Sequence, residues 1–288
     1  MIASILVLAS LYLLIALGYV IVYRTSRVLN FAHGDIFMIS GYLGFAAVSG
    51  LALTPLLALP ISAITGAIAG ALVYFVLMAS MAGHSVFAAV LVTIGLGIVI
   101  RGFALVGFKG QVIYPGRMLG FEDSSHEFLP GFVLSGIELT IVGSAVFILA
   151  GLMLFFRYSK LGIQMRAASR DSRLAAYRGI NIHVLFAIAW ALSTSIGMYA
   201  SALYSFHQQV GPNLTEIALR ALAVALVGGM DSLKGTIPAA IAVAAIEILV
   251  QRYVNAQVSE VIPYVVLVAV LLVRPWGLFG TKEFIDRV

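Results

Sequence analysis

Polar residues that interrupt long apolar segments are the first candidates for chemistry in this chain. Asn30, His33 and Asp35 stand together where the second apolar segment begins. A charged group at the centre of a bilayer costs roughly 2.5–3.5 kcal/mol on insertion scales, so it is normally paired or lines a wet cavity. Asn30 and Asp35 could cap a helix there, with Gly34 allowing close helix packing, or the polar group could shape a translocation route or gate.

A second set of membrane charges lies further along the chain. Arg220 and Glu247 fall within two late apolar segments that are separated by a glycine-containing turn. Glycines permit a tight reversal between two helices, so the two charges can pair across it and be hidden from lipid. We expect an intramembrane polar pair in preference to direct ligand binding.

The residue types and motifs of the sequence do not indicate an enzyme. The chain has no cysteine, its histidines lack metal-ligand spacing, and no serine nucleophile motif occurs. No G-x-x-x-x-G-K-[ST] phosphate loop is found; Gly229–Thr236 has glycines but not the Lys-Ser/Thr pair. We therefore expect no metal, no cofactor and no ATP hydrolysis by this chain itself.

Composition indicates where these residues reside. Of 288 residues, 62% are hydrophobic and 10% are charged, and the mean hydropathy is +1.08. Soluble domains usually carry about 25% charged residues. Apolar runs of roughly 18 residues or more recur, and their lack of alternation favours helices over barrel strands. The fold class is thus an all-α polytopic membrane protein, with residues 1–288 forming one transmembrane domain.

Eight to ten crossings are expected from the apolar runs. The second and seventh runs are short or glycine-rich, so either could be a re-entrant or broken helix. The N-terminal run is interpreted as a retained membrane span and not as a removed signal peptide. The candidate spans are Ile2–Tyr23, Phe31–Val48, Pro55–Ala79, Ser85–Phe108, Gly136–Phe156, Val184–Phe206, Glu216–Val227, Thr236–Val250 and Val261–Val273.

The basic residues predict orientation. Although the net charge is +5, the basic residues lie in loops between apolar spans, which indicates topology and not nucleic-acid binding. Placing Arg157–His183 in the cytoplasm puts 12 of the 17 Lys and Arg residues on that side; only Lys109, Arg117 and Arg252 are external, and Arg101 and Arg220 fall inside spans. The N-terminus is then outside, and residues 109–135 form an external surface loop.

The cytoplasmic loop, residues 157–183, is too long for a simple connection. Asp171 or Ser172 can cap a short helix that Gly179 ends in a left-handed conformation. Arg166, Arg170 and Arg173 have i, i+4, i+7 spacing, which would align them on one helical face. The segment could anchor at anionic headgroups or dock a cytoplasmic partner.

The sequence of this loop, RYSKLGIQMRAASRDSRLAAYRGINI, resembles that of LivH-type permeases of branched-chain amino acid ABC transporters. In that family the segment is the coupling helix that docks into the ATPase subunit, and the resemblance implies this role for Ser169–Ile180. The implied coupling residues are Arg166, Ala167, Ser169, Asp171, Ala175, Gly179 and Ile180.

Three further blocks carry the same resemblance in the same order. Asn30–Asp35 (NFAHGD) matches the family's first motif, and Arg24 and Arg27 depart from the small residues usual before it. Glu216–Val250 follows the family's Ala-rich helix, double glycine and acidic helix, and Arg274–Gly280 (RPWGLFG) is similar to its C-terminus.

The resemblance implies a type II ABC importer-like permease in the bacterial inner membrane that moves branched-chain amino acids by alternating access. Its implied partners are a sister permease subunit, two cytoplasmic ATPase subunits, a periplasmic solute-binding protein and the lipid bilayer. A same-family permease for urea, short amides or other amino acids is an alternative. A stand-alone secondary transporter or channel is another, although we find no internal repeat of the kind such proteins use.

Overall fold

Helices make up nearly all of the regular structure. The computed structural model describes residues 1–50, 54, 57–81, 84–119, 123–129 and 132–281. The helices are α1 (Ile2–Ser26), α2 (His33–Gly50), α3 (Ala58–Val73), α4 (Val86–Phe108), α5 (Pro115–Met118), α6 (Gly136–Tyr158), α7 (Lys160–Arg170), α8 (Ser172–Tyr177), α9 (Ile182–His207), α10 (Leu214–Gly228), α11 (Leu233–Tyr253), α12 (Ala256–Ser259) and α13 (Ile262–Val273). A π-helical turn, Tyr74–Met78, and a 3-10 turn, Ala79–Met81, continue α3.

Seven helical segments in the described part of the chain are long and apolar enough to cross a membrane. They correspond to seven of the nine spans expected from the sequence. The two expected to be short or glycine-rich form α2 and α10, which are helical but not among the seven. A multi-pass helical membrane protein is therefore confirmed, and the range of eight to ten crossings stays a prediction.

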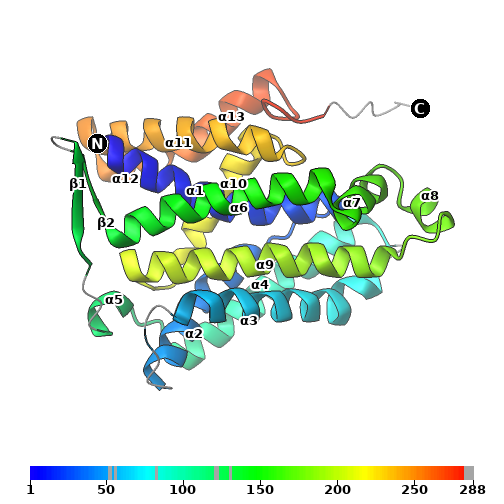
Figure 1. The fold of residues 1–288 in the computed structure, drawn as a ribbon, viewed down its shortest axis with the longest axis horizontal. Coiled ribbons are helices and arrows are strands. Elements are labelled where there is room, and N and C mark those ends of the chain that lie inside the picture. The colour runs from blue at the N-terminus through cyan, green and yellow to red at the C-terminus, as the bar shows by residue number, and fades with distance from the viewer. Residues whose placement is uncertain (51–53, 55–56, 82–83, 120–122, 130–131, 282–288) are drawn as a thin grey trace.

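Helix α1 runs through the middle of the bundle. It packs against α6, α9, α10 and α11 (Figure 1). The side chains of Leu14, Ile15 and Leu17 are fully covered. In the most apolar stretch of α1, 83% of residues are buried, against 11% for the segment that contains α13. α1 is thus the internal core, and the outer helices present apolar faces to lipid or to other subunits.

Close packing of α3 on α9 depends on two glycines spaced four residues apart. A Cβ at Gly66 would lie 2.7 Å from the Thr194 carbonyl oxygen, and one at Gly70 would lie 2.3 Å from the Trp190 carbonyl oxygen. Small residues at this spacing allow helix backbones to approach each other within a bilayer. The pair fixes α3 against the helix that follows the cytoplasmic loop.

The two long polar loops lie at opposite ends of the bundle. The N-terminus and a hairpin of β1 (Ser125–Leu129) and β2 (Phe132–Ser135) are at one end, and α7 and α8 are at the other (Figure 1). The external position of residues 109–135 and the cytoplasmic position of 157–183 stay predictions. The hairpin itself was not predicted, since its strands are only five and four residues long.

Replacing Gly70 by alanine should lower the free energy of unfolding by about 1–3 kcal/mol, because the added methyl group meets backbone atoms of α9 that cannot move aside. Thermal unfolding of the purified chain in detergent measures the effect. Gly143→Ala on α6 is the control, since a Cβ at Gly143 meets nothing within 4 Å. Equal stability of the two variants would contradict this packing.

Candidate functional site

The N-terminal ends of α2 and α10 meet inside the bundle. A Cβ at Gly34 would lie 3.3 Å from both the Thr215 and the Ala218 side chains, so Gly34 allows the close approach that the sequence suggested. α10 has 15 residues and spans about 22 Å, which is less than the roughly 30 Å of a bilayer core. α10 alone is therefore too short to cross the core, and its first turn, with Thr215, lies beside α2.

Asp35 forms an ion pair at this junction. Its Oδ1 accepts hydrogen bonds from Arg101 Nε at 3.0 Å and from the Thr215 hydroxyl at 3.1 Å, and Arg101 Nη2 lies 3.0 Å from the same oxygen. A Cβ at Gly97 would lie 2.5 Å from Oδ2, so that glycine makes room for the carboxylate. Asp35 also stands in the first turn of α2, where the helix dipole favours a negative charge.

Arg101 is the site residue that the sequence analysis missed, although its position inside an apolar span was visible. Its side chain retains 51% of its accessible surface, whereas that of Asp35 retains 7%. The surrounding face of α4 is apolar, with Ile98 and Val99 exposed beside it. An exposed guanidinium is costly against lipid, so this part of α4 faces water or another protein.

His33 lies deeper, against two glycines. A Cβ at Gly18 would be 2.4 Å from its ring, and one at Gly197 would be 2.7 Å away. The ring packs edge-on against Tyr19 with centroids 4.5 Å apart. This packing explains why α1 and α9 carry glycine at these positions.

Several buried polar atoms near His33 lack hydrogen-bond partners within the described residues. They are both ring nitrogens of His33, the side-chain oxygen and nitrogen of Asn30, and the hydroxyl groups of Tyr19 and Thr194. The side chain of Asn30 thus does not cap α2, and Asp35 is paired instead of capping. Burial of a polar group without a hydrogen bond costs about 1–3 kcal/mol, so these side chains lower the stability of the bundle.

The predicted pairing of Arg220 with Glu247 is present. Arg220 Nη1 lies 3.2 Å from Glu247 Oε1, and the Tyr12 hydroxyl donates to Glu247 Oε2 at 2.7 Å. Arg220 Nη2 is also 3.6 Å from Glu260. The network joins α10 and α11 to the central helix α1, and Tyr12 was not foreseen because nothing in the sequence relates it to Glu247.

The turn between α10 and α11 has the tight reversal expected from its glycines. Gly229 has φ +101°, and a Cβ at Gly228 would lie 2.7 Å from the Gly235 carbonyl oxygen. The C-terminal segment packs onto this turn, because the Phe279 amide donates to the Gly228 carbonyl oxygen at 3.1 Å.

The loop of residues 157–183 contains α7 and α8, and α8 begins at one of the two caps that the sequence offered. The Asp171 carboxylate accepts from the Leu174 amide at 2.9 Å, and Gly179 has φ +78°. However, α7 ends at Arg170 and Asp171 is extended, with φ −152° and ψ 102°. Arg173 therefore belongs to α8, and the expectation of one helical face shared by Arg166, Arg170 and Arg173 is wrong.

Ala175 was expected on a face of α8 that contacts a partner, and this expectation is also wrong. Its side chain is 5% exposed and packs into the core of this chain. Leu174 and Tyr177, by contrast, are 59% and 87% exposed. Among the other expected coupling residues, Arg166 and Ala167 are exposed, and Ser169 and Ile180 are half-buried.

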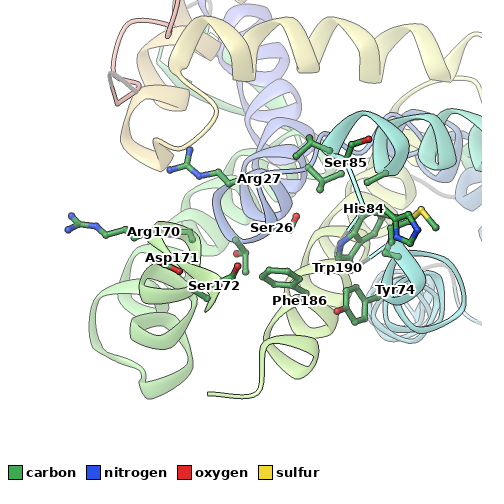
Figure 2. A pocket seen from close by; sticks show the side chains of 18 residues that line it. Ser26, Arg27, Tyr74, His84, Ser85, Arg170, Asp171, Ser172, Phe186 and Trp190 are labelled. Atoms are coloured by element: carbon green, nitrogen blue, oxygen red, sulfur yellow. The ribbon is translucent and has the colours of Figure 1, made fainter. Parts of the chain in front are cut away.

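A cavity of about 450 Å³ separates the α7–α8 junction from the bundle (Figure 2). Asp171 and Ser172 line it on one side, and Phe186 and Trp190 of α9 line it on another. Its wall includes Tyr74 in the π-helical turn, whose hydroxyl lies 2.9 Å from His183 Nδ1.

The described part of the chain is a multi-pass helical membrane bundle with internal ion pairs and a folded polar element, α7–α8, at one end. The family model described as the branched-chain amino acid transport system permease component matches residues 1–271, and the chain belongs to this family. Because members of this family are components of a transport system, the chain is expected to act together with other components of a transporter.

Curated relatives match along almost the whole chain. The high-affinity branched-chain amino acid transport system permease protein BraD of Pseudomonas aeruginosa is 26% identical over 96% of this chain and 94% of its own length. LivH of Escherichia coli is 26% identical over 96% of this chain and 93% of its own length. A probable LivH of Methanocaldococcus jannaschii is 25% identical over 94% of this chain and 89% of its own length. No solved structure matches significantly.

Neutralising either member of the Asp35–Arg101 pair should destabilise the chain, because the other charge loses its partner. We expect Asp35→Asn and Arg101→Gln each to lower the free energy of unfolding by about 1–3 kcal/mol. The decrease in the free energy of unfolding of the double variant should be about 0.5–3 kcal/mol smaller than the sum of the decreases of the two single variants. Denaturant unfolding in detergent measures all three, and strictly additive losses would show that the pair does not couple α2 to α4.

Proposed function

We propose that the chain is the permease subunit through which an ABC importer moves branched-chain amino acids across the bacterial inner membrane. The observation that carries this proposal is the family match over residues 1–271, together with relatives whose names specify this transport. The folded, surface-exposed α7–α8 element supports the ABC part, because a transporter driven by an ion gradient has no need for a cytoplasmic docking element.

The Asp35–Arg101 junction is the proposed wall of the translocation route. A branched-chain amino acid carries a carboxylate, an ammonium group and an apolar side chain. The junction offers a half-exposed guanidinium beside a buried carboxylate, with an apolar face of α4 around it. We infer that this face meets the sister permease subunit, so that solute passes between the two. Asn30, His33 and Gly34 then shape the gate behind the ion pair.

Energy has to come from separate ATPase subunits, because the sequence contains no phosphate-binding loop. We infer that two such subunits dock on the cytoplasmic side through α7 and α8, and that a periplasmic solute-binding protein delivers solute at the opposite end. In this proposal Asp171 and Gly179 fix the two ends of α8, and Ala175 anchors it to the bundle. Leu174 and Tyr177 make the contact, since aromatic side chains contribute strongly at interface centres.

Tyr177→Ala should weaken recovery of the ATPase subunits at least tenfold, in line with about 2 kcal/mol for an aromatic residue at an interface hot spot. Membrane insertion should be unchanged, because the side chain is 87% exposed and supports little of the fold. Pull-down with the tagged permease measures recovery. Tyr253→Ala is the matched control, since Tyr253 is 72% exposed at the far end of α11. Equal recovery with both variants would remove Tyr177 from the docking surface.

The purified chain alone should show no ATPase activity. With its partners in liposomes, hydrolysis should rise when binding protein loaded with leucine, isoleucine or valine is added. Uptake of labelled amino acid and phosphate release are measured in parallel. Uptake by this chain alone, driven only by a proton or sodium gradient, would contradict the ABC mechanism and favour a secondary transporter.

A further inference from the structure

The guanidinium of Arg101 is engaged along one edge only. Nε donates to Asp35 Oδ1 at 3.0 Å, and Nη2 lies 3.0 Å from the same oxygen. Within the described residues, this carboxylate is the partner of Arg101, so the end of the guanidinium that carries Nη1 has N–H groups left over. The side chain is 51% exposed, and these donors are therefore available to a ligand outside the bundle.

Asp35 holds this guanidinium in place from the interior. Its side chain is 7% exposed, and Oδ1 also accepts the Thr215 hydroxyl at 3.1 Å. Gly97, one turn before Arg101 on α4, permits this close contact, because a Cβ there would lie 2.5 Å from Asp35 Oδ2. A donor that is already ordered loses little conformational entropy when a ligand binds.

The surface of α4 around Arg101 is apolar. Ile98 precedes Arg101 by three residues and Leu105 follows it by four, so both lie on the same helical face as the guanidinium. Their side chains are 67% and 48% exposed. Beside them Gly102 leaves open space, since a Cβ there would meet nothing within 4 Å. This face combines an ordered guanidinium with an aliphatic surface.

The charge of the junction limits the solutes that fit. Arg101 and Asp35 already balance each other, so a simple anion bound to Arg101 would add an uncompensated negative charge in a medium of low dielectric constant. A zwitterion adds no net charge. In an α-amino acid the carboxylate and the ammonium group share one carbon, so the carboxylate can contact Arg101 while the ammonium group lies toward Asp35.

We propose that the free end of the Arg101 guanidinium binds the α-carboxylate of the transported amino acid, with Ile98 and Leu105 against its aliphatic side chain. Asp35 is a positioning residue that orients Arg101 and balances its charge. This inference rests on the proposed function and adds to it the residue that selects the solute. Arg101 favours zwitterionic amino acids over amides, amines and simple carboxylic acids.

The chain contains no cysteine, which allows a direct test. Gly102→Cys places one thiol beside Arg101 in open space, and a charged methanethiosulfonate reagent modifies a thiol only where water reaches it. The chain and its co-purified subunits are held in lipid nanodiscs, which expose both membrane faces to the reagent. We expect modification of Gly102→Cys, and leucine at about ten times its half-protecting concentration should slow it roughly tenfold.

Two analogues of leucine test the charged contacts separately. Leucinamide lacks the carboxylate, and 4-methylpentanoate lacks the ammonium group, whereas both keep the aliphatic side chain. Each should protect Gly102→Cys on the order of 10- to 100-fold more weakly than leucine, the range expected when a charge-assisted hydrogen bond is lost. This comparison requires no change at Arg101, so it does not depend on the folding of an Arg101 variant.

Variants of the ion pair test the two assigned roles in the Gly102→Cys background. Arg101→Gln should abolish the preference for leucine over leucinamide, and Arg101→Lys, which keeps the positive charge, should retain part of it. Asp35→Asn leaves the charge of Arg101 unbalanced. It should therefore improve protection by the anion 4-methylpentanoate relative to leucine, a shift that loss of stability alone would not produce.

Gly143→Cys on α6 is the matched control for water access. A Cβ at Gly143 also meets nothing within 4 Å, and both glycines lie about two turns from the helix end nearest the β1–β2 hairpin (Figure 1). Its thiol should stay unmodified, because the neighbouring Val146 and Phe147 present an apolar surface, 63% and 80% exposed. Equal modification of the two variants would contradict a water-filled route along α4.

Uptake of labelled leucine by the same subunits in proteoliposomes separates this inference from the proposed function. If leucine is taken up but leucine and leucinamide protect equally, Arg101 does not bind the carboxylate, and only the inference is wrong. The same conclusion follows if leucine is taken up and Gly102→Cys is never modified, because lipid or a neighbouring subunit then covers this face. Absence of both uptake and protection would contradict the proposed function itself.

Discussion

Charges carried into the apolar bundle have to be neutralised there, and the arrangement of the central helices follows from this requirement. Asp35 is matched by Arg101, and Glu247 is matched by Arg220. The first pair joins α2 to α4, and the second joins α10 to α11 and, through Tyr12, to α1. Each pair thus connects elements far apart in the sequence, and an unpaired member would leave a charge in a medium of low dielectric constant.

The same junctions bring the ends of two helices into the interior. α10 is too short to cross a bilayer core, and α2 begins beside its first turn, so the Thr215 hydroxyl reaches Asp35. The side chains of Asn30 and His33 are buried near the same junction. The stability of this interior therefore depends on how its polar side chains are accommodated.

The end of the bundle formed by α7 and α8 is connected to this interior through packed helices. α7 and α8 rest on the bundle through buried residues such as Met165 and Ala175, while cavities of about 450 and 530 Å³ flank their junction. Four residues connect α8 to α9, which packs on α3 at the closely spaced Gly66 and Gly70 and also contacts α2. α9 thus joins the α7–α8 end of the bundle to the interior, where Gly197 lies against His33.

The sequence by itself determined the helical membrane class, a helix cap at Asp171 or Ser172, the left-handed Gly179 and the pairing of Arg220 with Glu247, whereas the cytoplasmic side of residues 157–183 stays a prediction. These features follow from local rules: apolar run length, charge bias, capping chemistry and the cost of an isolated charge in lipid. Only the tertiary structure decided that Asp35 pairs with Arg101, that Tyr12 completes the second network and that Ala175 is buried while Tyr177 is exposed. Those outcomes depend on how helices rotate and pack against one another, and a single sequence does not encode that geometry in any local pattern.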